Sequence, residues 1–232
     1  MESKMTYDWQ TVKLVGITKP VGEQFEGNET PENLISYCAR VSNKKNQGRF
    51  DTAPKLLKYL IDNNHWSPLE TVSIVIEIQT TRDIARQILR HRSFTFQEFS
   101  QRYSEQPDMF PDEMMRETRL QDSKNRQSSL HTDNQMLIAQ WTLAQQEIQN
   151  KALSVYKWAL DSGIAKECAR AILPEGLTMT TLYCQGTLRS WYHYCMLRME
   201  NGTQLEHQDI AKKCWEIIKQ QFPVVEQFEN NQ

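Results

Sequence analysis

The sequence has 232 residues, enough for one sizeable domain with a buried core. Its 27 Lys and Arg residues nearly balance its 29 Asp and Glu residues, and the resulting net charge of −2 argues against a general nucleic-acid binder, which would carry a basic excess. No apolar run approaches the roughly 20 residues that cross a bilayer, so we expect a cytoplasmic protein without a membrane partner.

The first half of the chain is predicted to mix strands and helices. Residues 10–18 (QTVKLVGIT) are rich in β-branched residues and predict a strand. Helices are predicted over 31–41, where a threonine stands as N-cap before a proline, and over 53–63. Residues 71–79 (TVSIVIEIQ) alternate in polarity and predict a second strand, and a helix follows over 81–90.

The second half is predicted to be mostly helical. Residues 104–134 are polar and weakly periodic, which indicates a loop. A long amphipathic helix is predicted over 136–160, because apolar residues recur there every three or four positions. Further helices are predicted over 164–172, 178–200 and 205–222. With no internal repeat and no linker, the chain reads as a single domain with an α/β fold, of the α+β type, that is helix-rich in its C-terminal half.

One segment, residues 90–104 (RHRSFTFQEFSQRYS), concentrates cations and aromatic rings in an otherwise balanced chain. Guanidinium groups recognise phosphate through paired, charge-assisted hydrogen bonds, and aromatic side chains hold flat rings. The segment therefore favours a ligand that carries a phosphate and a ring, with a salt-bridged loop over the core as the structural alternative. Arg82 and Arg86, one helical turn apart, are interpreted as a solvated face.

The segment also resembles the R-H-R-x7-S signature of the flavin-dependent thymidylate synthase family. Other parts of the chain are similar to that family's remaining motifs, in the same order: Ala39-Arg40-Val41-Ser42, His65-Trp66-Ser67-Pro68-Leu69-Glu70, Ala169-Arg170-Ala171-Ile172-Leu173-Pro174, and Leu188-Arg189-Ser190 followed by Leu197-Arg198. The resemblance covers roughly residues 10–228. It implies one domain over residues 1–232 with a central, mostly antiparallel sheet flanked by helices.

The resemblance further implies an activity and its small-molecule partners. Members of this family make dTMP from dUMP, with methylenetetrahydrofolate as carbon donor, NADPH as hydride source and FAD as the relay. They are homotetramers whose active sites lie where subunits meet, and they need neither metal nor nucleic acid. No G-x-G-x-x-G follows a predicted strand, so a Rossmann cradle is not expected, and arginine side chains must hold the phosphates instead.

By position, the resemblance assigns two overlapping sets of residues. It implies dUMP binding by Gln87, Arg90, Glu98, Ser100, Gln101, Arg102, Arg170 and Arg198. It implies FAD contacts from Ser67, Arg90, His91, Arg92, Glu98, Thr187, Arg189 and His193, with Ser42 as a further candidate. Thr187 stands where the family commonly has an asparagine.

Arg198 is expected to be the catalytic residue, because the matching family arginine lies beside the uracil ring. A guanidinium there favours loss of the N3 proton and so raises the electron density at C5. Ser100 is interpreted as a hydrogen-bond donor to the nucleotide rather than as a nucleophile, since activation of a serine needs a correctly placed base.

Three other functions stay open from the sequence. The first is a cofactor-free thymidylate synthase with Cys184 or Cys195 as nucleophile, although neither lies beside an obvious arginine cluster. The second is a binding module that grips single-stranded nucleic acid through residues 90–104. The third is flavin- and folate-dependent methylation of uracil in RNA.

Overall fold

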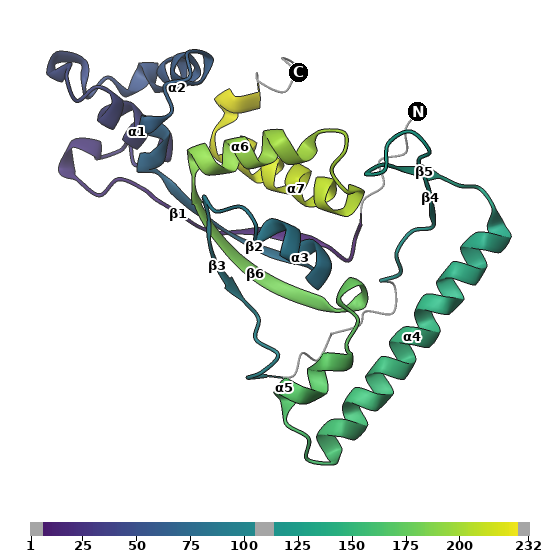
Figure 1. The fold of residues 1–232 in the computed structure, drawn as a ribbon. Helices are drawn as coiled ribbons and strands as arrows, with labels where there is room; N and C mark the ends of the chain where they lie inside the picture. The colour runs from purple at the N-terminus through teal and green to yellow at the C-terminus, as the bar shows by residue number, and fades with distance from the viewer. Residues whose placement is uncertain (1–6, 105–113, 227–232) are drawn as a thin grey trace.

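A four-stranded antiparallel sheet forms the centre of the structure, a computed structural model that describes residues 7–104 and 114–226 (Figure 1). The strand order is β1-β2-β6-β3, so segments far apart in sequence pair directly. The strands span Thr11–Ile17 (β1), Ser73–Thr81 (β2), Met179–Thr187 (β6) and Thr95–Glu98 (β3). A two-stranded hairpin, Arg119–Gln121 (β4) with Ser129–His131 (β5), lies apart from this sheet.

Helices cover mainly one face of the sheet. Their bounds are Pro31–Ala39 (α1), Ala53–Asp62 (α2), Arg82–Ile88 (α3), Gln135–Asp161 (α4), Lys166–Ala169 (α5), Leu188–Met199 (α6) and Leu205–Gln221 (α7). Short 3-10 helices span Glu23–Phe25, Lys44–Asn46, Phe50–Thr52, Ser67–Thr71, Arg170–Ile172 and Glu175–Leu177. Ile74, Ile76 and Ile78 on β2 are fully buried in a core shared with α6 and α7. The indole of Trp191 donates to the carbonyl of Ile74 over 3.2 Å and fixes α6 on the sheet.

Most of the predicted elements are confirmed to within a few residues. The segments 10–18, 31–41, 53–63, 71–79 and 81–90 correspond to β1, α1, α2, β2 and α3. The helices predicted over 136–160 and 205–222 correspond to α4 and α7. The α1 cap is also confirmed, because the side chain of Thr30 accepts a hydrogen bond from the backbone N–H of Asn33 over 3.2 Å.

The single helix predicted over 178–200 is wrong. Its first half is strand β6, in which Leu182, Cys184 and Gly186 alternate as buried residues, and Thr187 then caps α6. Gly186 is required where it stands, because a Cβ atom there would overlap the ring of Phe94. Strand polarity has a period of two, and three small or hydroxylated residues at the start of the segment masked that period.

Two further expectations need correction. The loop predicted over 104–134 contains the β4–β5 hairpin, while residues 105–113 lie outside the described part of the chain. The helix predicted over 164–172 is a single α-helical turn, α5, that continues as a 3-10 helix. Strand β3 was not predicted at all, because its four residues lie inside the cationic segment and carry only a short alternation.

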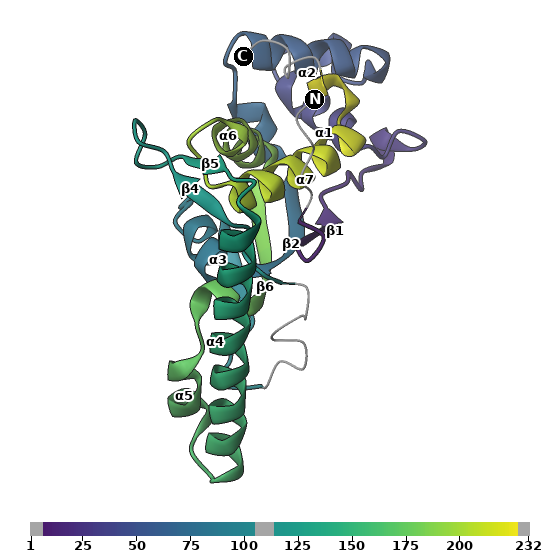
Figure 2. The same cartoon turned by 90° about the vertical axis from the view of Figure 1, so that its right-hand side faces the viewer.

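Helix α4 projects beyond the sheet (Figures 1 and 2). Several of the apolar residues on which its amphipathic pattern rests lie at the surface: Trp141 is 45% exposed and Ile148 is 55% exposed. The buried positions are instead Gln145, Gln149, Ala152, Tyr156 and Ala159. Within residues 7–104 and 114–226, no helix is both long and apolar enough to cross a membrane.

A buried ion cluster fixes the start of α7. Glu206 is fully buried, and it accepts a hydrogen bond from Arg119 over 2.6 Å while Arg116 lies 3.4 Å away. Burial alone would raise the pKa of the Glu206 carboxyl, but the two arginines outweigh that effect and lower it. The next residue along α7, His207, is thereby held at the edge of the candidate site.

Candidate active site

Four of the predicted site residues meet beside α3 and α6. Gln87 lies on α3, Arg90 and His91 lie in the turn that follows, and Arg198 lies in the last turn of α6. Arg198 Nε donates to His91 Nε2 over 2.9 Å. This bond joins positions 107 residues apart in the chain. It depends on the antiparallel sheet, which brings the α3 turn next to α6 (Figure 1).

His91 is neutral at pH 7. Burial, with the charges of Arg198 and Arg90, lowers the pKa of its imidazole to about 4. Because Nε2 accepts from Arg198, the single ring proton is on Nδ1. Only Nε of Arg198 takes part, and among the described residues its Nη groups have no hydrogen-bond partner. Those Nη groups are therefore available to an anion.

The amide of Gln87 is held by the N-cap residue and the first turn of α7. Its Nε2 donates to Gln204 Oε1 over 2.7 Å, and its Oε1 lies 3.2 Å from His207 Nδ1. His207 Nε2 in turn lies 3.1 Å from the hydroxyl of Tyr194. Three helices thus converge on one predicted nucleotide-binding side chain.

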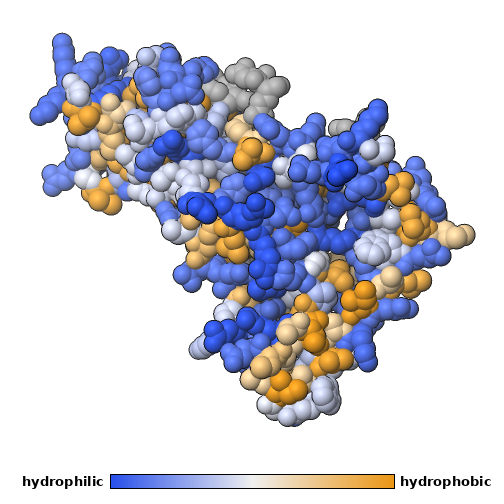
Figure 3. Space-filling view, in the orientation of Figure 1, coloured by the Kyte–Doolittle hydropathy of each residue, from blue (hydrophilic) through white to orange (hydrophobic). Residues whose placement is uncertain are grey.

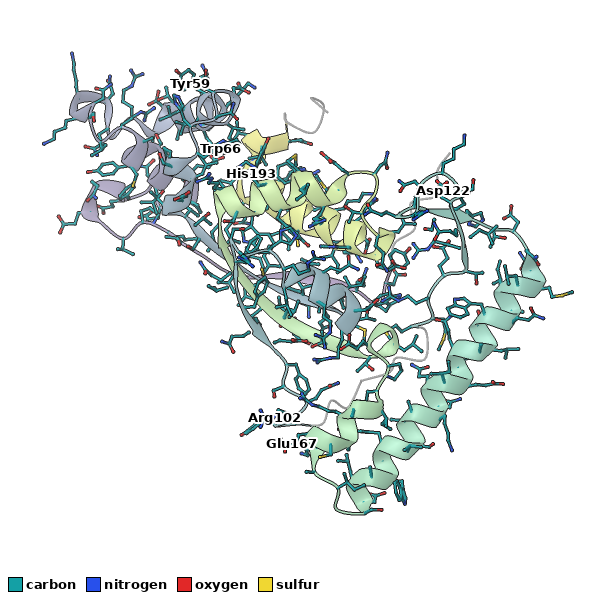
Figure 4. All side chains as sticks on the ribbon, in the orientation of Figure 1. Tyr59, Trp66, Arg102, Asp122, Glu167 and His193 are labelled. Carbon is teal, nitrogen blue, oxygen red and sulfur yellow. The ribbon has the colours of Figure 1, made fainter. Side chains whose placement is uncertain are left out.

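A second group of predicted residues lies at the start of α6. The ring of His193 packs against Trp66 with 4.4 Å between centroids, and Figure 4 shows these two side chains together. Burial and the nearby charge of Arg189 lower the pKa of His193. Arg189 forms an ion pair with Glu70, which follows Ser67 in the same 3-10 helix. This arrangement offers an aromatic surface beside a cation, which suits a flat anionic cofactor.

Thr187 is occupied by a structural role. Its hydroxyl accepts from the backbone N–H of Ser190 over 3.3 Å and so caps α6. The FAD contact assigned to Thr187 stays a prediction, and it would share that hydroxyl with the cap.

A third group lies near the end of β3. Glu98 accepts from Thr180 over 3.1 Å and lies 3.3 Å from Arg82. Gln101 is 3% exposed, and its Nε2 has no hydrogen-bond partner among the described residues. Such a buried, unsatisfied donor is costly unless a ligand binds it.

An open cleft of about 440 Å³ adjoins this group. It is lined by Ser100, Arg102, Tyr103, Ala165, Lys166 and Glu167. Arg102 pairs with Glu167 over 3.2 Å, and Figure 4 shows both near α5. Arg170 lies one turn after Glu167, at the start of a 3-10 helix.

One chain therefore divides the predicted residues between two places. Gln87, Arg90, His91 and Arg198 lie beside α6, whereas Ser100, Arg102 and Arg170 lie at the α5 end of the sheet. In Figure 4, Arg102 is far from the labelled His193. Arg92 and Ser42 are exposed on loops. The structure therefore does not bring together, within one chain, the four arginines assigned to dUMP: Arg90, Arg102, Arg170 and Arg198.

Sequence reasoning missed several residues of the site. Arg82 was assigned to a solvated face, but its side chain is 16% exposed and pairs with Glu98, whereas Arg86 is exposed and pairs with Glu175. His207 and Tyr194 were not singled out at all. His207 belongs to a polar run, Glu206–Asp209, whose burial shows only once α7 is placed. The burial of this polar run is what distinguishes these residues, and burial cannot be read from the sequence alone.

Burial also bears on the cysteine-nucleophile alternative. Cys184 and Cys195 lie in the core, and burial raises the pKa of both thiols. A thiol that stays protonated and has no path to solvent is a poor nucleophile, so the structure opposes this alternative.

Comparison with known proteins adds family information. The family model described as thymidylate synthase complementing protein matches residues 25–224. A probable flavin-dependent thymidylate synthase from Paramecium bursaria Chlorella virus 1 is 48% identical over 93% of this chain and 96% of its own length. A flavin-dependent thymidylate synthase from Synechocystis is 44% identical over 92% of this chain and 96% of its own length.

Solved structures show the same architecture. A UMP/dUMP methylase, PolB from Streptomyces cacaoi, bound with 5-Br dUMP, aligns with a TM-score of 0.74 and 25% identity. The alignment covers 93% of this chain and 92% of that one. The α+β fold with a mostly antiparallel sheet is therefore confirmed.

Proposed function

Because the chain belongs to the flavin-dependent thymidylate synthase family, we propose that it converts dUMP to dTMP with methylenetetrahydrofolate as carbon donor, NADPH as reductant and FAD as cofactor. The observation that carries the proposal is the pair of Arg198 and neutral His91 beside Gln87. His91 orients the guanidinium of Arg198, whose Nη groups have no hydrogen-bond partner among the described residues. The amide of Gln87 nearby suits the edge of a uracil ring.

Arg198 stabilises negative charge on the uracil ring. As the N3 proton leaves, the guanidinium lowers the pKa of that group by about 1–3 units for a close pair out of bulk water. The charge delocalises to C5, the carbon that receives the one-carbon unit. Neutral His91 orients Arg198 through Nε and adds no second cation, so the Nη groups keep one geometry.

The donor set fits the two anionic ligands. Arg90 and Arg92 are exposed on the turn after α3, and Arg189 lies beside the Trp66–His193 rings. Arg102, Arg170 and the unsatisfied Nε2 of Gln101 suit the nucleotide phosphate and sugar. Bound at these residues, FAD would supply the hydride chemistry, with NADPH as the source of the hydride. Ser100, exposed at the cleft, then needs only to donate a hydrogen bond to the nucleotide.

A homotetramer with sites at subunit interfaces accounts for the division of these residues. A neighbouring chain would bring its Arg102 and Arg170 to Gln87, His91 and Arg198 of the first chain. Within one chain these two sets of residues lie apart. The exposed apolar residues of α4 support this proposal: Met136, Trp141, Leu143, Ile148 and Trp158. Figure 3 shows apolar side chains at the surface over the part of the molecule where α4 and α5 lie. Exposed apolar residues gathered on one helix are typical of an interface between subunits.

One assay tests the activity. The purified protein is incubated with FAD, dUMP, methylenetetrahydrofolate and NADPH, and dTMP is measured with each component left out in turn. We expect dTMP only when all are present. Formation of dTMP without flavin, or none with the full set, would overturn the proposal.

UMP belongs in the same assay as a second candidate substrate. The UMP/dUMP methylase that shares this fold is described with both nucleotides. If UMP competes with dUMP, the site tolerates a 2′-hydroxyl, and if it does not, the site is specific for the deoxynucleotide.

A further inference from the structure

We propose that His207 is a positioning residue, which holds the amide of Gln87 in the single orientation that binds the nucleotide base. This inference rests on the proposed function, since it concerns the same nucleotide site. No family motif named above contains His207; its hydrogen bond to the site goes to Gln87, and its ring lies edge-on to that of His91 with 6.3 Å between centroids.

The hydrogen bonds around Gln87 fix where each proton lies. Gln87 Nε2 donates to Gln204 Oε1 over 2.7 Å, so the amide oxygen is the atom that faces His207 Nδ1 at 3.2 Å. An amide oxygen can only accept, and His207 Nδ1 must therefore carry the ring proton. His207 Nε2 is then a bare acceptor, and the hydroxyl of Tyr194, 3.1 Å away, donates to it.

The surroundings keep this arrangement in place. His207 is 1% exposed and Tyr194 is 2% exposed, so water does not compete for these bonds. Burial and the neighbouring Arg198 and His91 lower the pKa of His207 to about 3, and the ring has only one proton at pH 7. His207 cannot donate to both neighbours, so its one ring proton goes to Gln87 from Nδ1 while the Tyr194 hydroxyl donates to Nε2.

Fixing the amide has a consequence for the base. One N–H and one oxygen lone pair of Gln87 are used within the protein, which leaves one donor and one acceptor for a ligand. If the amide rotated by 180°, donor and acceptor would exchange places against the uracil edge. A mismatched hydrogen bond of this kind weakens binding by about tenfold.

The test uses the FAD-loaded enzyme and follows dUMP binding by the change in flavin absorbance. We expect His207→Phe, which fills the space but donates nothing, to weaken dUMP binding about tenfold while FAD content stays at the wild-type level. His207→Asn keeps an N–H near the position of Nδ1 and should restore most of that loss. Tyr194→Phe should weaken dUMP binding by a smaller factor. It removes only the donor to Nε2, so that either ring nitrogen of His207 can then carry the proton.

A double-mutant cycle separates positioning from a general structural role. In a Gln87→Ala background, His207→Phe should have no further effect on dUMP affinity, because the hydrogen bond by which it positions the base is gone. An equal loss in both backgrounds would overturn the inference. If His207→Phe fails to load FAD, Tyr194→Phe in the same two backgrounds distinguishes the same two outcomes. If wild-type enzyme loaded with FAD does not bind dUMP, it is the proposed function that fails.

Discussion

At the residue scale, the candidate site depends on imidazoles that stay uncharged at neutral pH. His91 accepts a hydrogen bond from Arg198, and His207 donates one to Gln87. A protonated His91 would lose its acceptor and repel Arg198. The residue types of the 90–104 segment indicated a phosphate and ring site, but the proton positions follow only from the contacts and burial.

The role of Arg198 predicts a large and selective loss. Arg198→Ala should fold and bind FAD nearly normally, since Arg198 lies in the last turn of α6 and is not a core residue. dTMP formation should fall by about 10²–10³-fold, the usual effect of removing a donor from a developing negative charge. Arg86→Ala is the matched control, because Arg86 is exposed and paired with Glu175, and it should stay within a few-fold of wild type. An active Arg198→Ala enzyme would remove Arg198 from the mechanism.

The lowered histidine pKa values predict a loss of stability in acid. His91 and His207 titrate at about 4 and 3 in the folded chain, below their ordinary value of 6.5, so the unfolded chain binds protons first as pH falls. Their contribution to the free energy of unfolding is complete above pH 6.5 and declines toward pH 4. The slope is at most about 1.4 kcal/mol per pH unit and per histidine, and smaller for half-buried His91, where solvent screens the charges.

Urea unfolding at pH 7.5, 6 and 5 measures this slope. His91→Asn should flatten it. His131→Asn is the control, because Asp133 raises the pKa of that exposed histidine and its contribution has the opposite sign. A slope that His91→Asn leaves unchanged would contradict the assignment.

At the element scale, a helix or strand was predictable where the apolar residues kept the same spacing along the whole segment. β2 alternates in burial from Ser73 to Thr80, and the buried apolar residues of α7 recur at helical spacing, so both were located within two residues. The segment 178–200 failed because strand and helix adjoin there without a loop, and Thr187 ends one and caps the other. Helix α4 was located correctly, but the sequence pattern does not show what its apolar residues face, since such residues can face another chain as well as their own core.

The close approach of β6 to the 90–104 segment gives a stability prediction. Gly186→Ala should lower the free energy of unfolding by about 1–3 kcal/mol, because the new methyl group collides with Phe94 in the core. Thermal or urea unfolding measures the change. Gly48→Ala is the control, since nothing lies within 4 Å of a Cβ there and its effect should be near zero. Equal stability of the two variants would contradict the packing described for Phe94.

At the scale of the whole molecule, the site residues that the sequence motifs assign do not all come together within one chain. The motifs name Arg102, Arg170 and Arg198 without saying which chain supplies each one. One chain separates the first two from the third, because α5 and α6 lie at different ends of β6. Assembly is information that no single-chain pattern contains.

Mixing inactive variants tests whether subunits share sites. Arg102→Ala and Arg198→Ala chains, unfolded and refolded together, should recover a measurable fraction of wild-type activity, because some sites then receive both intact groups. Arg198→Ala mixed with Gln87→Ala should recover none, since these two residues belong to the same group in one chain. Recovery in both mixtures, or in neither, would contradict shared sites.

The positions of the cysteines give the experimenter a natural attachment point. Cys184, Cys195 and Cys214 are buried, whereas Cys168 is exposed on α5 and directly follows Glu167 of the cleft. With half-buried Cys38 changed to serine, a thiol-reactive fluorophore would label Cys168 alone. Its emission would report on nucleotide arrival at the α5 end while the flavin spectrum reports on the α6 end, so the order in which the two ends respond becomes measurable in one cuvette.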